Sequence, residues 1–171
     1  MIIGRGDIAS AIADVPSLDC PDRIYFASGV SNSQESDAAA YEREAALLMQ
    51  QDFTKHLIYF GSLSVFYANT RYTQHKRTME ALIRTHFLRH TIMRLGIIDW
   101  GTNPHTLINY LRAEHKAGRP LRIDNTYRYV LTIGEFHHWL GLIPDWSCEM
   151  NITGTRMTVH QIVSRYVLPQ V

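Results

Sequence analysis

The chain is organised around residues 56–101, which read HLIYFGSLSVFYANTRYTQHKRTMEALIRTHFLRHTIMRLGIIDWG. Residues 56–60 and residues 91–98 are short apolar runs, typical of buried strands. Residues 70–87 predict a helix between them, because apolar side chains recur on one of its faces. These side chains are Met79, Leu82, Ile83 and Phe87. A strand, a crossover helix and a second strand predict a right-handed parallel unit.

The composition fits one domain with a substantial core, since 46% of the 171 residues are apolar. A formal net charge of +1 does not favour nucleic acid or an acidic membrane surface as a partner. No stretch approaches the roughly 20 apolar residues of a membrane span. The first residues also lack the basic and apolar regions of a signal peptide.

The cysteines and histidines indicate the redox environment of the protein and whether it holds a metal. Cys20 and Cys148 are the only cysteines, and a reduced intracellular pair is the simplest interpretation, so we expect a cytoplasmic protein. The nine histidines are scattered, without a cysteine or carboxylate cluster at ligand spacing. We therefore expect no metal site.

The glycine loop, residues 4–9, reads Gly4-Arg5-Gly6-Asp7-Ile8-Ala9 and has the form G-x-G-x-x-A. Gly4 permits a tight turn, Gly6 lets the backbone approach a pyrophosphate, and Ala9 lets the helix pack close to the strand. The loop follows a short apolar strand at residues 1–3 and opens a helix, which favours dinucleotide binding. A glycine turn without a ligand is the alternative interpretation of so short a motif.

A second motif lies inside the central unit. Ser62 follows the first strand of the unit, and Tyr72-x-x-x-Lys76 opens its helix, with both side chains on one face. This arrangement resembles the short-chain dehydrogenase/reductase superfamily, and more closely its extended branch of NAD-dependent nucleotide-sugar epimerases, dehydratases and reductases. Counting back from Val65 in the family pattern Ser-Ser-x-x-Val-Tyr selects Ser62, with Ser64 as the second choice.

The resemblance continues in order along nearly the whole chain. Residues 93–101 resemble the family's Leu-Arg-x-x-x-x-Tyr-Gly segment, with one extra residue. Residues 128–136 resemble its Arg-x-Phe-Val-x-Val-x-Asp segment, and residues 150–154 its Tyr-Asn-Val-Gly segment. For Arg94, a structural ion pair and a contact with substrate remain equally open.

The resemblance implies a catalytic set of Ser62, Tyr72 and Lys76. A free tyrosine has a pKa near 10, and an ammonium one helical turn away favours its phenolate. Tyr72 would exchange a proton with a substrate hydroxyl or carbonyl, while Ser62 would hold that oxygen. Lys76 would also hold the nicotinamide ribose, and hydride would pass between substrate and nicotinamide.

The resemblance also implies NAD or NADP as the cofactor, with three groups of residues around it besides Lys76. The glycine loop would supply Gly4, Arg5, Gly6, Asp7 and Ile8. The end of a strand over residues 23–27 would supply Ala27, Ser28 and Gly29. A later segment would supply Gly96 and Ile97 through backbone contacts. Arg5 either pairs with a phosphate or is a surface arginine.

The chain departs from the family at its adenosine side. The strand at residues 23–27 corresponds to the family's fourth strand, so there is no room for the second and third. The family's second strand ends in the residue that reads the adenosine ribose. Asp19 and Asp22 are candidates for that role, although an aspartate in a turn is the better interpretation of both. The adenosine half of the pocket is open, rebuilt or absent.

The remaining pattern predicts a helix at residues 37–51 capped by Asp37, and a last helix at residues 159–167 capped by Thr158. The pattern also predicts helices from residue 8 to about 14, at 103–118 and at 135–142, paired strands at 121–123 and 127–133, and a strand at 147–152.

Together these features predict an α/β fold, a Rossmann-like parallel sheet sandwiched by helices. It would lack the family's second and third strands and most of its substrate domain. Residues 1–171 would form one domain, in which residues 119–171 are a small extension corresponding to the family's substrate-side elements. The trimmed sheet edge is a plausible contact for a partner subunit, so a homo-oligomer is a further expectation.

Two functions remain open on the sequence. The first is an NAD(P)-dependent oxidoreductase, epimerase or dehydratase acting on a small molecule, either a nucleotide-sugar or another carbonyl or hydroxyl compound. The second is a binding or structural protein derived from the same fold, without turnover.

Overall fold

The computed structural model describes residues 1–15, 18, 20–121 and 123–168. Its main sheet has five strands in the order β1, β2, β3, β4 and β7, and every pairing is parallel. The strands are β1 (Ile2–Ile3), β2 (Arg23–Phe26), β3 (His56–Ser62), β4 (Arg89–Leu95) and β7 (Cys148–Ile152). The predicted Rossmann-like parallel sheet is confirmed.

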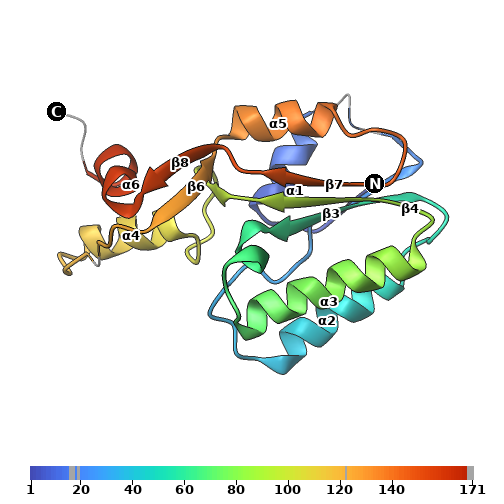
Figure 1. The fold of residues 1–171 in the computed structure, drawn as a ribbon, viewed down its shortest axis with the longest axis horizontal. Coiled ribbons are helices and arrows are strands. Elements are labelled where there is room, and N and C mark those ends of the chain that lie inside the picture. The colour runs from blue at the N-terminus through green and yellow to red at the C-terminus, as the bar shows by residue number, and fades with distance from the viewer. Residues whose placement is uncertain (16–17, 19, 122, 169–171) are drawn as a thin grey trace.

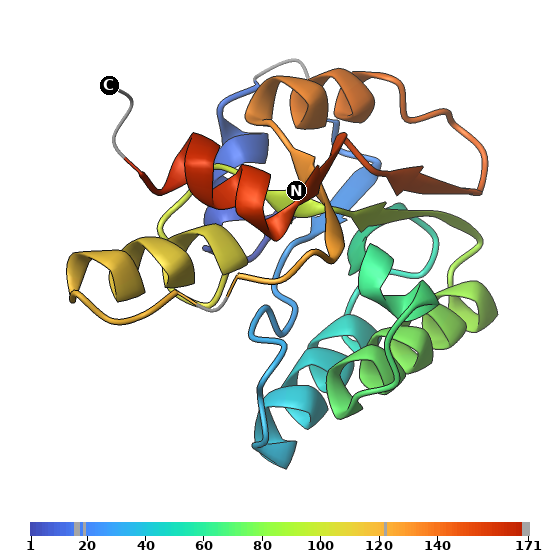
Figure 2. The same ribbon diagram turned by 60° about the vertical axis from the view of Figure 1, so that its left-hand side comes forward.

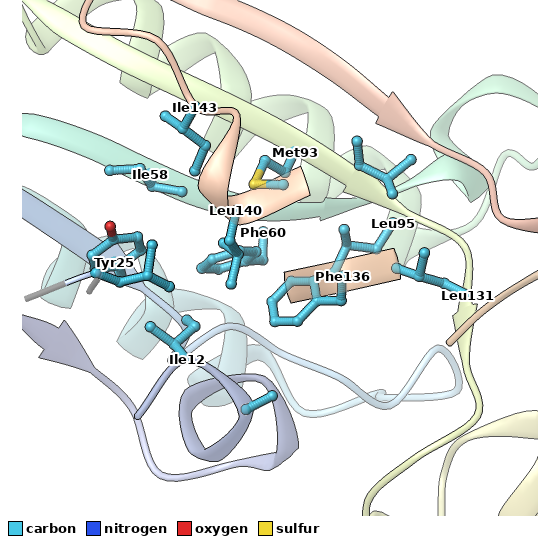
Figure 3. Packing of buried hydrophobic residues seen from close by; sticks show 13 residues of the cluster. Ile12, Tyr25, Ile58, Phe60, Met93, Leu95, Leu131, Phe136, Leu140 and Ile143 are labelled. Atoms are coloured by element: carbon cyan, nitrogen blue, oxygen red, sulfur yellow. The ribbon is translucent and has the colours of Figure 1, made fainter. Parts of the chain in front are cut away.

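Helices cover both faces of this sheet (Figure 1). One face packs against α1 (Asp7–Ala13) and α5 (Ile133–Gly141), and the other against α2 (Ala38–Met49) and α3 (Arg71–His86). Side chains of β3 alternate between the two cores, as successive residues of a strand must. Leu57 and Tyr59 belong to the α2 and α3 side, whereas Ile58 and Phe60 belong to the α1 and α5 side (Figure 3).

A smaller sheet lies beyond the ends toward which the arrows of β3, β4 and β7 point (Figure 1). It contains β5 (Ile97–Ile98), β6 (Tyr127–Leu131) and β8 (Thr155–Thr158), in that order. Two helices, α4 (Leu107–Lys116) and α6 (Val159–Tyr166), share an apolar cluster with it and lie side by side (Figure 2). Because ligands of open parallel sheets bind outside the carboxyl ends of the strands, the smaller sheet forms one wall of that region.

Short polar side chains set where the helices begin. Asp37 accepts a hydrogen bond from the backbone N–H of Ala39, and Thr158 forms a capping box with Gln161. Both predicted caps are confirmed. Thr70, expected inside a helix, is instead the N-cap of α3. These caps fix the first turn of each helix, which matters most for α3 because Tyr72 lies in that turn.

Three expectations about the elements are wrong. The strand expected at residues 91–98 is two strands, because the chain leaves the main sheet at Gly96 and joins the smaller one. The helix expected at residues 103–118 begins only at Leu107, since the Thr106 hydroxyl caps it. Strand β6 pairs with β5 and β8, and not with Leu121 or Ile123; residue 122 of the expected strand at 121–123 lies outside the described part.

Two elements were not expected at all. Strand β8 is one, and the other is a single 3-10 turn, η2 (Leu63–Phe66), which follows β3. Among the described residues, every helix is too short or too polar to cross a bilayer.

Candidate functional site

A cleft of about 920 Å³ opens at the carboxyl edge of the main sheet, between that edge and the smaller sheet. This volume lies within the usual range for small-molecule sites. Its walls include nearly all of the residues that the sequence predicted for a cofactor or for catalysis. These are Arg5, Gly6, Asp7, Ile8, Ala27, Ser28, Gly29, Ser62, Tyr72, Lys76, Gly96 and Ile97. Parallel strands bring them together, because the ends of β2, β3 and β4 meet at one edge.

Gly4 is not among the residues that line the cleft. Its φ of 134° is a conformation that side chains with a Cβ rarely adopt. A Cβ at this position would also lie 2.3 Å from the carbonyl oxygen of Ala27. The glycine loop therefore passes directly over the end of β2, and Gly4 permits that approach.

Asp7 connects two walls of the cleft. Its carboxylate accepts hydrogen bonds from the backbone N–H groups of Thr102 and Asn103, each at 3.0 Å. The Asn103 side-chain amide in turn donates to the Ser31 hydroxyl at 2.9 Å. The carboxylate of Asp7 thus holds the segment after β5 against the glycine loop, a role that the motif alone did not reveal.

Ser62 and Ser64 lie together where β3 becomes the 3-10 turn. Their hydroxyl oxygens are 2.8 Å apart, and the Ser62 hydroxyl accepts from the Ser64 backbone N–H at 3.2 Å. Both serines line the cleft, as does Tyr72 from the first turn of α3. Two serine hydroxyls and the Tyr72 side chain therefore border the same cleft.

Lys76 is paired with a carboxylate that the sequence analysis missed. Its ammonium donates to both oxygens of Glu44, at 3.0 and 3.3 Å, and lies 5.6 Å from the centre of the Tyr72 ring. The Lys76 side chain is only 2% exposed, and that of Glu44 is fully buried. The pair stands at the junction of α2 and α3, where the cleft meets the core.

Glu44 is ionised despite its burial. Desolvation alone would raise its pKa, but the Lys76 ammonium and hydrogen bonds from His75 and the Val30 backbone hold that pKa at about 2. The Tyr59 hydroxyl also donates to Glu44, at 2.9 Å. Burial and the neighbouring Glu44 charge raise the pKa of Tyr59 well above its usual value, so its hydroxyl stays a donor.

A signal for Glu44 is present in the sequence of α2. Tyr41, Glu44 and Leu48 are the buried residues of this helix, and their spacing of three and four places them on one face. A carboxylate within such a stripe must find a cation or several donors, because a buried unpaired charge is costly. The partner could not be identified from spacing within the helix, since Lys76 comes from a different helix.

Of the two interpretations left open for Arg94, the structure supports the structural ion pair and not a contact with substrate. Its guanidinium donates to Glu80 at 2.8 and 2.6 Å and to Glu149 at 2.7 Å, and it stacks over the Phe66 ring. The hydrogen bonds that Arg94 donates to Glu80 and Glu149 raise the pKa of Arg94, although burial opposes this. Arg94 is not among the residues that line the cleft.

The adenosine side of the expected cofactor site is not rebuilt by Asp22. This aspartate precedes β2 and pairs with Arg89 at 2.5 Å, so it lies at the amino end of the strands, opposite the cleft. The interpretation of Asp22 as a turn residue is correct. Asp19 lies outside the described residues. Within the described part of the chain, β1 is the outermost strand on this side.

Comparison with known proteins gives a consistent answer at the level of the fold. No sequence profile of a known family matches the chain, and no curated protein matches it by sequence. The enzyme WbmG of Bordetella bronchiseptica, solved with NAD, matches with a TM-score of 0.64 and 15% identity over 96% of this chain and 64% of that one.

Two further solved structures match in the same way. The capsular polysaccharide assembling protein CapF from Staphylococcus aureus gives a TM-score of 0.63 at 13% identity, over 93% of this chain and 55% of that chain. The UDP-glucose 4-epimerase of Thermus thermophilus, solved with NAD, gives 0.57 at 13% identity, over 92% and 63%.

The chain therefore has the Rossmann-like fold of these three structures, in a shortened form. It spans between 55% and 64% of the length of these three structures. At such low identities the likeness extends to the fold, and the function has to be argued from the cleft.

Proposed function

We propose that the protein binds NAD or NADP in the cleft and transfers hydride between its nicotinamide and a small-molecule substrate. The observation that carries this proposal is the convergence of the glycine loop, Ser62, Tyr72 and Lys76 on one cleft. The proposed activity is that of an oxidoreductase, epimerase or dehydratase. Its substrate would be a nucleotide-sugar or another compound with a carbonyl or hydroxyl group.

The cleft has a surface suited to a phosphate-bearing ligand at the glycine loop. A Cβ on Gly6 would find no heavy atom within 4 Å, so bare backbone borders open space there. Arg5 lies on the same wall and can compensate a phosphate charge. The neighbours support the same class of ligand, since WbmG was solved with NAD and UDP, and a Bacillus anthracis dTDP-4-dehydrorhamnose reductase with NADP.

Each proposed catalytic residue has a distinct task. The Tyr72 hydroxyl would give a proton to a substrate carbonyl oxygen, or take one from a hydroxyl, while Ser62 holds that oxygen by a hydrogen bond. Lys76 would place its charge near the phenol and donate to the nicotinamide ribose. The nicotinamide, when bound, supplies or accepts the hydride.

A second candidate function is that of a binding or structural protein without turnover. Two observations favour it: Glu44 compensates the charge of Lys76, and β1 is an edge strand within the described residues. The division that assigns residues 119–171 to the substrate side, the cytoplasmic location and a homo-oligomeric state all remain predictions.

Thermal denaturation with a panel of NAD⁺, NADH, NADP⁺ and NADPH tests the proposal. A bound dinucleotide stabilises the native state by mass action, so at least one of the four is expected to raise the Tm. ATP at the same concentration is the control for general anion effects. A Tm that none of the four dinucleotides changes would contradict the proposed cofactor.

A further inference from the structure

The Glu44 carboxylate joins four parts of the molecule. It belongs to α2 and accepts hydrogen bonds from Lys76 of α3, from Tyr59 of β3 and from the backbone N–H of Val30, the last at 2.7 Å. His75 contributes a fourth contact, its Nε2 lying 3.1 Å from the second carboxylate oxygen. Both oxygens are thus surrounded by donors that come from separate segments.

Two of these segments form the cleft. Lys76 lines it from α3, and residues 27–31, the segment after β2 that contains Val30, line it from the other side. Gly29 shows how tightly they meet, since a Cβ there would lie 2.7 Å from the Lys76 ammonium and 2.9 Å from a Glu44 oxygen. Glu44 therefore determines where the ammonium and this wall lie relative to each other.

Stability alone does not account for this arrangement. Replacing a buried ion pair with apolar side chains of similar size is often neutral or even stabilising. In the Glu44–Lys76 pair, Lys76 lines the cleft. The pair is therefore better explained by the fixed position that Glu44 gives to Lys76.

We propose that Glu44 is a positioning residue that fixes the Lys76 ammonium and the residue 27–31 wall for the nicotinamide ribose of a dinucleotide. This role of Glu44 rests on the proposed function. It adds to that function the residue that holds Lys76 in place as a hydrogen-bond donor. Glu44 touches neither substrate nor cofactor, because it is fully buried behind Lys76.

The Glu44→Asp variant tests this inference because it keeps the charge and retracts the carboxylate by one methylene. Affinities for NADH and for ADP are measured by calorimetry, together with the Tm. NADH carries the nicotinamide ribose and ADP lacks it. We expect the affinity for NADH to fall at least tenfold while the affinity for ADP changes less than twofold. Glu42→Asp, on the exposed face of the same helix, is the matched control and should alter neither affinity.

Tyr59→Phe provides a second variant should Glu44→Asp fail to fold. It removes one donor to Glu44 without leaving an unpaired charge, and we expect about a threefold loss of NADH affinity with ADP binding unchanged. Equal losses for NADH and ADP, or an unchanged NADH affinity in both variants, would overturn the positioning role. A wild-type protein that binds no dinucleotide would overturn the proposed function itself, and the inference with it.

Discussion

Two buried carboxylates on neighbouring helices have opposite relations to the cleft. Glu44 of α2 pairs with Lys76, which lines the cleft, whereas Glu80 of α3 pairs with Arg94, which does not. Both acids are nearly inaccessible, at 0% and 3% exposure. The same physical requirement, a cation for each buried carboxylate, thus serves a candidate site in one place and the packing of the fold in the other.

The two carboxylates differ in the segments from which their hydrogen-bond and ion-pair partners come. Glu44 accepts hydrogen bonds from three segments besides its own helix, and two of these segments are cleft walls. Glu80 is bound by two arginines, Arg84 and Arg94, which Glu149 of β7 also bridges. Removing one cation should therefore harm stability at both places, but should harm ligand binding only near Glu44.

The largest expected effect is on turnover, from Tyr72→Phe. Loss of the hydroxyl removes the proposed proton donor, and general acid-base groups contribute about 10²- to 10⁴-fold to rates. We expect the rate with an accepted substrate to fall by that factor while NADH affinity stays within twofold of wild type. Turnover that survives this change would remove Tyr72 from the proposed chemistry and favour another proton donor. Tyr110→Phe, an exposed tyrosine on α4, is the control.

Lys76→Met should be the most destabilising of the substitutions at the two carboxylates. It leaves the Glu44 charge buried without its ammonium, and breaking a buried pair in this way costs about 3–5 kcal/mol. Urea denaturation would measure the lower free energy of unfolding, and calorimetry should detect no NADH binding. If a folded Lys76→Met protein still binds NADH, Lys76 does not contribute to binding of the cofactor.

Arg94→Met should destabilise less than Lys76→Met, because Glu80 retains Arg84 at 3.0 Å. We expect a loss of about 2–3 kcal/mol, below the cost of a fully broken buried pair. The NADH affinity of the folded fraction should stay within twofold of wild type. A tenfold weaker NADH affinity would contradict the difference between the two carboxylates, because it would show that the Glu80 cluster also affects ligand binding.

The pH dependence of stability isolates the Glu44 charge. Its pKa is about 2 in the folded protein against an ordinary value of 4.5, so the unfolded state binds more protons between these values. The stabilisation is present above about pH 4.5 and is lost as the pH falls toward 2. Unfolding free energies measured across this range should decline less steeply in Glu44→Gln than in wild type, and Glu42→Gln should behave as wild type. Parallel curves for Glu44→Gln and wild type would contradict the assigned ionisation.

Asp22→Asn should have the smallest effect. The Asp22–Arg89 pair is partly exposed, at 56% and 39%, and such surface pairs contribute about 0–1 kcal/mol. We expect an unfolding free energy within that range of wild type and an unchanged NADH affinity. Weaker NADH binding in Asp22→Asn would instead indicate that Asp22 contacts the adenosine ribose.

The sequence predicted the parallel sheet and the helices that cross it, because apolar periodicity and capping residues are local signals. Asp37 and Thr158 were identified as caps on this basis, and the structure agrees. The division at Gly96 was missed, since residues 91–98 read as one apolar run although the chain changes sheets within it. Strand β8 was missed because four residues carry too little pattern to distinguish a strand from a turn.

The candidate site was predictable to the extent that it depends on motifs. Ser62, Tyr72, Lys76 and the glycine loop were identified in advance, and they lie around one cleft. Glu44 was not, because its partners are distant in sequence and only the tertiary packing brings them together. Asp7 differs again, since the motif located the residue while its carboxylate contacts the segment after β5.

A crystal structure with bound NAD would test most directly whether this cleft holds a dinucleotide against Lys76. We expect the nicotinamide ribose hydroxyls within hydrogen-bonding distance of the Lys76 ammonium, and the pyrophosphate beside Gly6. A dinucleotide bound elsewhere on the protein, or a cleft that stays empty at saturating NAD, would contradict it.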